Sequence, residues 1–184
     1  SFIFIYLFLN LYIYITDRKP YIMSTFSRDL KRGKKFEEKH LAIIQKTYPD
    51  AYMIDGYCKE WDIYIPSEKF GIEVKSDKMS QQTGNIVVEI KFNGKPSALS
   101  TTKAKYWIFD TGVDTIYASV DDLKELVSNP KFSSYPFFRP NFIAKGDSLP
   151  KAIYFIPQRF IEEINLTIEA ILQPETKGQL DKFL

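Results

Sequence analysis

Two short segments of alternating apolar and polar residues, at positions 60–66 and 70–76, place the strongest constraint on the fold of this chain. Successive side chains of a β-strand point to opposite sides, so such alternation predicts strands with one face in a core and one polar face. The turn sequence PSEKFG joins the two segments. They therefore predict a β-hairpin whose polar face carries Asp62 on one strand and Glu73 with Lys75 on the other.

Further strands and helices are expected on both sides of this hairpin. Apolar residues at helical spacing between positions 27 and 48, followed by Pro49, predict a helix that precedes it. The remaining patterns predict strands at 51–57, 84–90 and 106–110, helices within 97–105 and at 120–127 and 157–172, and a long loop at 129–150. This order indicates an α/β fold with a mixed central β-sheet flanked by helices.

The chain of 184 residues, with 45% hydrophobic content, is long enough for one sizeable core, which we expect at 23–184 as a single domain. Residues 1–22 differ in composition. Their apolar run is interrupted by Asn10 and is shorter than the roughly 20 residues that span a bilayer, and they lack the pattern of a signal peptide. We expect an apolar N-terminal extension that comes from upstream in-frame translation or from a fragment. A membrane anchor or an extra strand is the alternative.

The composition excludes several kinds of chemistry. A single cysteine, Cys58, excludes an internal disulfide and a cysteine-based zinc site, and a single histidine, His40, excludes multi-histidine metal sites and histidine-dependent catalytic triads. Both are expected to be ordinary packed residues. Chemistry must then come from carboxylates, lysines and hydroxyls.

The predicted hairpin brings suitable groups together. Asp62 and Glu73 converge at one end of it, and two carboxylates suit a hard divalent cation such as Mg²⁺, which prefers oxygen ligands and keeps several waters. Lys75 shares a strand face with Glu73, where an amine can orient or help to deprotonate an attacking water. Glu37 begins the apolar stripe of the preceding helix, one turn before Leu41. This combination is suited to phosphodiester cleavage.

The helix with Glu37, then Asp62, then EVK at positions 73–75 resembles the PD-(D/E)XK nuclease superfamily. The segments RGKKFEEKHLAII, WDIYI and GIEVK are similar to those of archaeal Holliday-junction resolvases, and the resemblance covers roughly residues 28–110. One departure is Trp61, which stands where the signature proline would precede Asp62.

The resemblance implies a restriction-endonuclease-like core with the order α-β-β-β-α-β. It implies that Asp62 and Glu73 hold Mg²⁺, for which Mn²⁺ substitutes, with the carbonyl of Val74 assisting. It further implies that Lys75 acts on the attacking water and that Glu37 supports the site.

These observations predict an intracellular, cytoplasmic, metal-dependent endonuclease that hydrolyses DNA. We expect no small-molecule cofactor and no membrane partner. Selectivity for branched DNA and a homodimer would follow if the chain acts as a junction resolvase. The alternatives are a homing or restriction-like site-specific endonuclease, and a catalytically silent nucleic-acid-binding module of the same fold. The simplest structural alternative is that Glu73 and Lys75 pair across an exposed sheet face while Asp62 caps a turn.

Several other segments are candidates for DNA contacts, each with an ordinary structural alternative. The basic run contains Arg28, Lys31, Arg32, Lys34 and Lys35, and suits either phosphate contact or a solvated helix start. Residues 81–85 form either a polar grip on the substrate or a plain connection, and the hydroxyls and lysines of 97–105 suit phosphate binding or helix capping. Glu89 is either a further site carboxylate or, as we expect, a surface residue. Tyr135, Phe137, Phe138 and Arg139 are expected either to stack on unpaired bases or, more commonly, to pack over the core.

Overall fold

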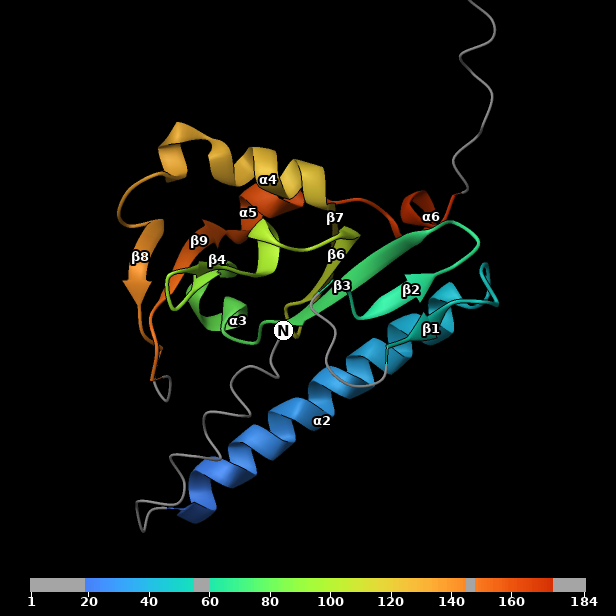
Figure 1. The fold of residues 1–184 in the computed structure, drawn as a ribbon, viewed down its shortest axis with the longest axis horizontal. Coiled ribbons are helices and arrows are strands. Elements are labelled where there is room, and N and C mark those ends of the chain that lie inside the picture. The colour runs from blue at the N-terminus through green and yellow to red at the C-terminus, as the bar shows by residue number, and fades with distance from the viewer. Residues whose placement is uncertain (1–18, 55–59, 145–147, 174–184) are drawn as a thin grey trace, which may run out of the picture.

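The structure of the chain is a computed structural model that describes residues 19–54, 60–144 and 148–173, with side chains from residue 30 onward (Figure 1). The helices are α2 (Lys19–Ile44), α3 (Ser80–Thr83), α4 (Val120–Ser128), α5 (Gln158–Glu162) and α6 (Ile168–Ile171), with 3₁₀ turns η1 (Ala98–Ser100) and η2 (Pro130–Phe132). The strands are β1 (Tyr52–Met53), β2 (Ile63–Ile65), β3 (Phe70–Ser76), β4 (Asn85–Phe92), β5 (Lys95–Pro96), β6 (Ala104–Asp110), β7 (Thr115–Ser119), β8 (Phe138–Phe142) and β9 (Lys151–Pro157).

A five-stranded sheet in the order β1-β2-β3-β6-β7 contains the predicted hairpin. Strands β2 and β3 pair antiparallel, with Ile63 opposite Ile72 and Ile65 opposite Phe70. Strand β6 then pairs parallel with β3, while β7 returns antiparallel to β6. The predicted α/β class, with a mixed sheet flanked by helices, is therefore confirmed.

The two faces of this sheet bury different clusters, as strand alternation requires. On the face that α2 covers, Ile63, Ile72, Val74 and Ile108 pack with Phe36 and other residues of the helix side. On the opposite face, Trp107 and Phe109 of β6 pack with residues of α4, α5 and a second sheet. The same strands thus serve two cores, one on each side.

The second sheet is antiparallel and has the order β5-β4-β9-β8. Its strand β4 confirms the strand predicted at 84–90, but β4 pairs with β9 and β5 rather than joining the first sheet. The connection from β3 to β6 therefore runs through α3, β4, β5 and η1, instead of the single helix that the order α-β-β-β-α-β requires. The sequence pattern at 151–157 does not predict β9.

The helix predicted within 97–105 is only the three-residue turn η1. Two features explain its brevity. Ala98 has a positive φ of 42°, which α-helices do not contain. The hydroxyls of Thr101 and Thr102 donate to the carbonyls of Ala98 and Glu60, so they bond locally and to a neighbouring segment instead of extending a helix.

The other elements differ from expectation mainly in their limits. The first helix begins earlier than position 27 and ends at Ile44, and the strand predicted at 51–57 is reduced to β1, with positions 55–57 outside the described residues. The predicted loop at 129–150 includes η2 and β8.

The helix predicted at 157–172 is divided into α5 and α6. Between them, the Asn165 side chain accepts a hydrogen bond from the backbone N–H of Tyr117, and the N–H of Leu166 donates to the Tyr117 carbonyl. These bonds attach the segment to the edge of β7, and they replace the continuous helix. Within residues 19–54, 60–144 and 148–173, no helix combines the length and apolar character that a membrane crossing needs.

Candidate active site

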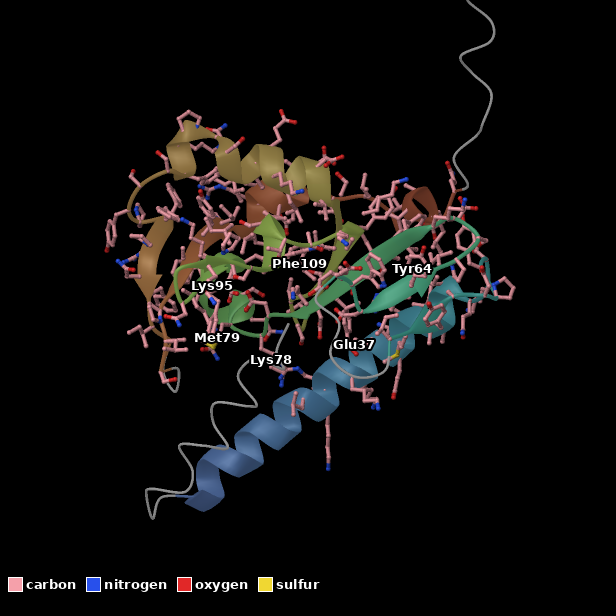
Figure 2. The ribbon with its side chains drawn as sticks, in the orientation of Figure 1. Glu37, Tyr64, Lys78, Met79, Lys95 and Phe109 are labelled. Carbon is pink, nitrogen blue, oxygen red and sulfur yellow. The ribbon has the colours of Figure 1, made fainter. Side chains whose placement is uncertain are left out.

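Helix α2 brings Glu37 to the sheet because the neighbouring residues on the same side are apolar and buried. Phe36, His40 and Ile44 form the buried stripe, whereas Leu41, expected in that stripe, is only half-buried. Glu37 lies at the border of the stripe and is half-buried. Figure 2 labels Glu37 on the part of α2 that passes β2 and β3.

His40 is a packed residue, as predicted. It is 1% exposed, its Nδ1 lies 3.1 Å from the Phe36 carbonyl oxygen, and its Nε2 lies 3.4 Å from the Tyr117 hydroxyl. Burial lowers the pKa of the imidazole and favours its neutral form. The prediction for Cys58 lies outside the described residues.

Asp62 is fixed against β3 by both its backbone and its side chain. Its backbone N–H donates to the Ile72 carbonyl at 3.0 Å, and its carboxylate Oδ2 accepts a hydrogen bond from the Val74 N–H at 2.8 Å. The Asp62 carboxylate therefore links the residue just before β2 to the middle of β3. It is bonded to a strand, and so it does not cap a turn as the structural alternative requires.

Glu73 and Lys75 form an ion pair on one face of β3, with the Lys75 ammonium donating to Glu73 Oε1. Their side chains are only 8% and 15% exposed. The ammonium also lies 5.2 Å from the ring centroid of Trp107, on the neighbouring parallel strand. This burial contradicts the alternative of a solvated pair on an exposed sheet face.

The pKa directions show that the four predicted site residues interact electrostatically. Burial, followed by the negative charges of Asp62 and Glu73, raises the pKa of Glu37 from 4.5 to about 7. Burial and the charge of Glu73 likewise raise the pKa of Asp62. The structure thus brings Asp62, Glu73 and Lys75 together at β3, and the charges of all three act on Glu37.

Lys75 partly compensates this concentration of carboxylates. Burial alone would lower the pKa of the Lys75 ammonium, but the charges of Glu73 and Asp62 outweigh it and raise the pKa. Burial alone would raise the pKa of Glu73, but the adjacent ammonium helps to lower it. Lys75 thus stabilises the charged form of Glu73, while Asp62 and Glu37 hold their protons more tightly than free carboxyl groups do.

The donor atoms of Asp62 and Glu73 are suitable for Mg²⁺. No group of three or more His, Cys, Asp or Glu side chains is arranged for a metal ion in the part of the chain that the structure describes. Mg²⁺, however, is usually held by one or two carboxylates together with waters and substrate phosphate oxygens. Asp62 and Glu73 supply carboxylates of this kind, and a Mg²⁺ ion held by them with the carbonyl of Val74 stays a prediction.

The structure adds neighbours that sequence patterns did not connect with the site. Arg32 Nε donates to the Ser76 hydroxyl at 3.2 Å, and that hydroxyl donates to Asp110 Oδ2 at 3.2 Å. From the sequence, Arg32 is only one member of the basic run. Ser76 directly follows Lys75, and Asp110 of β6 pairs with Ser76 of β3 across the parallel strands. The parallel register that joins them has no local sequence signal.

Two other candidates lie outside this cluster. Glu89 is on β4, where the Ser97 hydroxyl donates to it at 2.7 Å and Lys151 lies 3.8 Å away, so it belongs to a polar group of the second sheet. Residues 81–83 form part of α3, and Gly84 ends that helix with a left-handed φ of 67°. They make a capped, largely exposed connection directly after the site.

Comparisons of the chain with protein-family models, with curated proteins and with solved structures found no match.

Proposed function

We propose that this chain is a metal-dependent endonuclease that hydrolyses DNA phosphodiester bonds. The observation that carries the proposal is the buried cluster in which Asp62 bonds to the backbone of Val74 between the ion-paired Glu73 and Lys75. Charged groups are costly to bury, and clusters with strongly perturbed pKa values occur preferentially at functional sites.

The arrangement of elements supports a restriction-endonuclease-like core. Helix α2 precedes three antiparallel strands, and a fourth strand, β6, pairs parallel with the third. This agrees with the resemblance to the PD-(D/E)XK superfamily over residues 28–110. The departure is the crossover between β3 and β6, which contains strands of the second sheet instead of one helix.

In the proposed reaction, Asp62 and Glu73 hold Mg²⁺ or Mn²⁺. When bound, the metal supplies charge neutralisation at the scissile phosphate and lowers the pKa of an attacking water. The Val74 N–H fixes the orientation of the Asp62 carboxylate. Lys75 holds its ammonium beside Glu73, where it orients the water and attracts the phosphate. Glu37 supports the two carboxylates from α2, since the charges of Asp62 and Glu73 act on it.

The proposal is tested by incubating the protein with Mg²⁺ and labelled linear duplex, single-stranded, flap and four-way-junction DNA. Cleavage of at least one substrate is expected with Mg²⁺ or Mn²⁺, and loss of cleavage is expected in chelator or with Ca²⁺. Preference for the junction would favour a resolvase-like activity. Full cleavage in excess chelator, or none of any substrate with either metal, would contradict the proposal.

Asp62→Asn is the most direct variant because it preserves shape and removes the metal-binding charge. Cleavage should be abolished, while DNA binding is retained or strengthened since a repulsive charge is lost. Asp121→Asn is the matched control, because Asp121 is exposed in the first turn of α4. An Asp62→Asn protein that cleaves like the Asp121→Asn control would exclude Asp62 from the site.

A further inference from the structure

The two faces of the second sheet have different surroundings. One face carries Ile86, Val88 and Ile156, which pack in a buried cluster with Leu123 of α4 and Ile161 of α5. Neighbouring residues on these strands point the other way, because side chains alternate along a strand. On that opposite face, Val87 pairs with Phe155 and is 37% exposed.

Aromatic rings and a guanidinium group meet on this opposite face. Arg139 of β8 places its guanidinium carbon 4.0 Å from the ring centroid of Tyr135 and 5.9 Å from that of Phe155. Phe142 contacts Phe155 edge to face, with centroids 5.3 Å apart. Arg139 Nε also donates to the Pro136 carbonyl at 3.3 Å, which fixes the guanidinium beside the rings. We call Tyr135, Arg139, Phe142 and Phe155 the aromatic face.

The structure separates the four residues that the sequence had grouped as stacking candidates. Phe137 packs against the buried Phe132 with centroids 5.2 Å apart, and Phe138 packs against Tyr154 at 4.9 Å. Both are therefore used in packing. Tyr135, in contrast, is 73% exposed although Arg139 stacks on it. An exposed aromatic ring can stack on a nucleic-acid base, and the neighbouring guanidinium supplies a cation for the phosphate backbone.

The charge of the second sheet favours an anionic ligand. On the face that carries Phe155, the strand registers place the basic residues Lys95, Arg139 and Lys151 and one acidic residue, Glu89, which lies 3.8 Å from Lys151. Aromatic rings that stack bases, combined with cations that contact the phosphate backbone, are the two elements by which proteins bind single-stranded nucleic acid. A purely apolar partner would not use this excess of positive charge.

We propose that the aromatic face binds unpaired nucleotides of single-stranded DNA, with a base stacked on Tyr135 and the backbone near Arg139. Tyr135, Arg139, Phe142 and Phe155 lie on or just before β8 and β9 of the second sheet, whereas Asp62, Glu73 and Lys75 lie on or just before β2 and β3 of the first, and Figure 1 shows β8 on the side of the molecule away from β2. The inference goes beyond the proposed function, because this binding requires neither a metal nor Asp62, Glu73 and Lys75.

The test measures binding of a fluorescent oligothymidylate to the full chain by anisotropy in excess chelator, where no metal-dependent cleavage takes place. Tyr135→Ala should weaken binding about tenfold, since it removes one stacking ring. Tyr135→Phe should bind like the parent, because stacking does not need the hydroxyl. Tyr52→Ala is the matched control, since Tyr52 is a 45% exposed tyrosine on β1, in the other sheet. Thermal unfolding of each variant verifies that the fold is retained.

Arg139→Lys separates stacking from charge. Lysine retains the positive charge but not the planar group, so weaker binding with an unchanged dependence on salt concentration is expected. Unlabelled duplex of the same length should compete poorly, because its bases are already stacked.

The proposal is overturned if Tyr135→Ala binds like the parent, if Tyr52→Ala loses as much affinity, if duplex competes equally, or if the parent does not bind the oligonucleotide. Failure of the nuclease proposal is distinguishable, because a chain that binds oligothymidylate and cleaves nothing would contradict only the cleavage reaction.

Discussion

Burying the charged groups of the candidate site costs the folded protein free energy. Two carboxylates and one ammonium, from Asp62, Glu73 and Lys75, lie within the hairpin, and the charge of Glu37 adds repulsion. Replacing buried ion pairs with apolar residues of similar volume is often neutral or stabilising, so stability alone gives no reason for such a cluster. The proposed catalytic role of these groups gives a reason for burying them.

Lys75→Ala distinguishes a catalytic role from simple attraction of DNA. If Lys75 positions the attacking water, single-turnover cleavage at saturating DNA should fall on the order of a hundredfold, as expected for loss of a positioned acid-base group. If Lys75 only contacts phosphate, saturating DNA should restore the rate, and the salt dependence should decrease by about one unit.

Lys78→Ala is the control for that measurement, because Lys78 is exposed, three residues beyond Lys75. It should affect binding alone. Circular dichroism should first show that Lys75→Ala is folded, since this change removes the ammonium paired with Glu73. Near-parental cleavage by folded Lys75→Ala at saturation would exclude a role for the ammonium in the chemical step.

Glu37 should make stability depend on pH in a predictable direction. Its pKa of about 7 lies above the ordinary 4.5, so the folded state holds this proton more tightly than the unfolded state. The resulting contribution to stability is complete below about pH 4.5 and is lost as pH rises through 7. Glu37→Gln should therefore become more stable relative to the parent as pH increases from 4.5 to 8, by on the order of 1 kcal/mol, because solvent screens a half-buried group.

Urea unfolding of the two proteins in chelator at pH 4.5 and pH 8 measures this difference. Glu38→Gln, at the exposed neighbouring position, is the control. An equal stability difference between parent and Glu37→Gln at both pH values would contradict the raised pKa of Glu37 and hence its burial beside Asp62 and Glu73.

At the scale of elements, the β2–β3 hairpin positions the site through a close contact between Trp61 and Gly71. A Cβ atom at Gly71 would lie 2.4 Å from Cγ of Trp61, so the indole occupies the space that any side chain would need. Trp61 also stacks on Tyr64 with ring centroids 4.9 Å apart. Because Trp61 immediately precedes Asp62, this packing fixes the backbone just before β2. It therefore also fixes the position from which the Asp62 carboxylate reaches β3.

Gly71→Ala should therefore destabilise the protein by about 1–3 kcal/mol and reduce cleavage, because the displaced indole carries Asp62 with it. Gly33→Ala on α2 is the matched control: a Cβ there meets nothing within 4 Å, and alanine should stabilise the helix by about 0.5–1 kcal/mol. Denaturant unfolding and cleavage assays of both variants measure these effects. Equal stability of Gly71→Ala and the parent would show that the contact is not tight.

At the scale of the whole molecule, one mixed sheet joins two cores. Strands β2 and β3 contribute Ile63, Ile72 and Val74 to the cluster on the α2 side, whereas β6 contributes residues to both clusters. Met53 of β1 packs at the border of the α2 cluster. Both cores are therefore built on the sheet that also carries Glu73 and Lys75.

A chain that starts at Met23 should fold and cleave like the full chain, because the predicted domain and all four predicted site residues follow that position. Far-ultraviolet circular dichroism and the Mg²⁺-dependent cleavage assay measure this outcome. Aggregation of the shorter chain, or loss of its sheet signal, would instead indicate that residues 1–22 supply a necessary element such as an extra strand.

The sequence alone determined the parts whose signals are local. Alternation at 70–76 gave the limits of β3, the same alternation placed Glu73 and Lys75 on one face, and helical spacing placed Glu37 beside a buried stripe of α2. These predictions succeeded because side-chain direction along a strand or helix follows directly from its period.

Only the tertiary structure decided the long-range pairings. The parallel register of β3 with β6 brings Trp107 beneath Lys75 and Asp110 beside Ser76, and β4 joins β9 in a separate sheet. Such pairings depend on which distant strands satisfy one another's hydrogen bonds and bury common apolar faces. The residues of one strand do not specify which distant strand will pair with it. The division into two sheets and the neighbours of the site are therefore seen only in the folded chain.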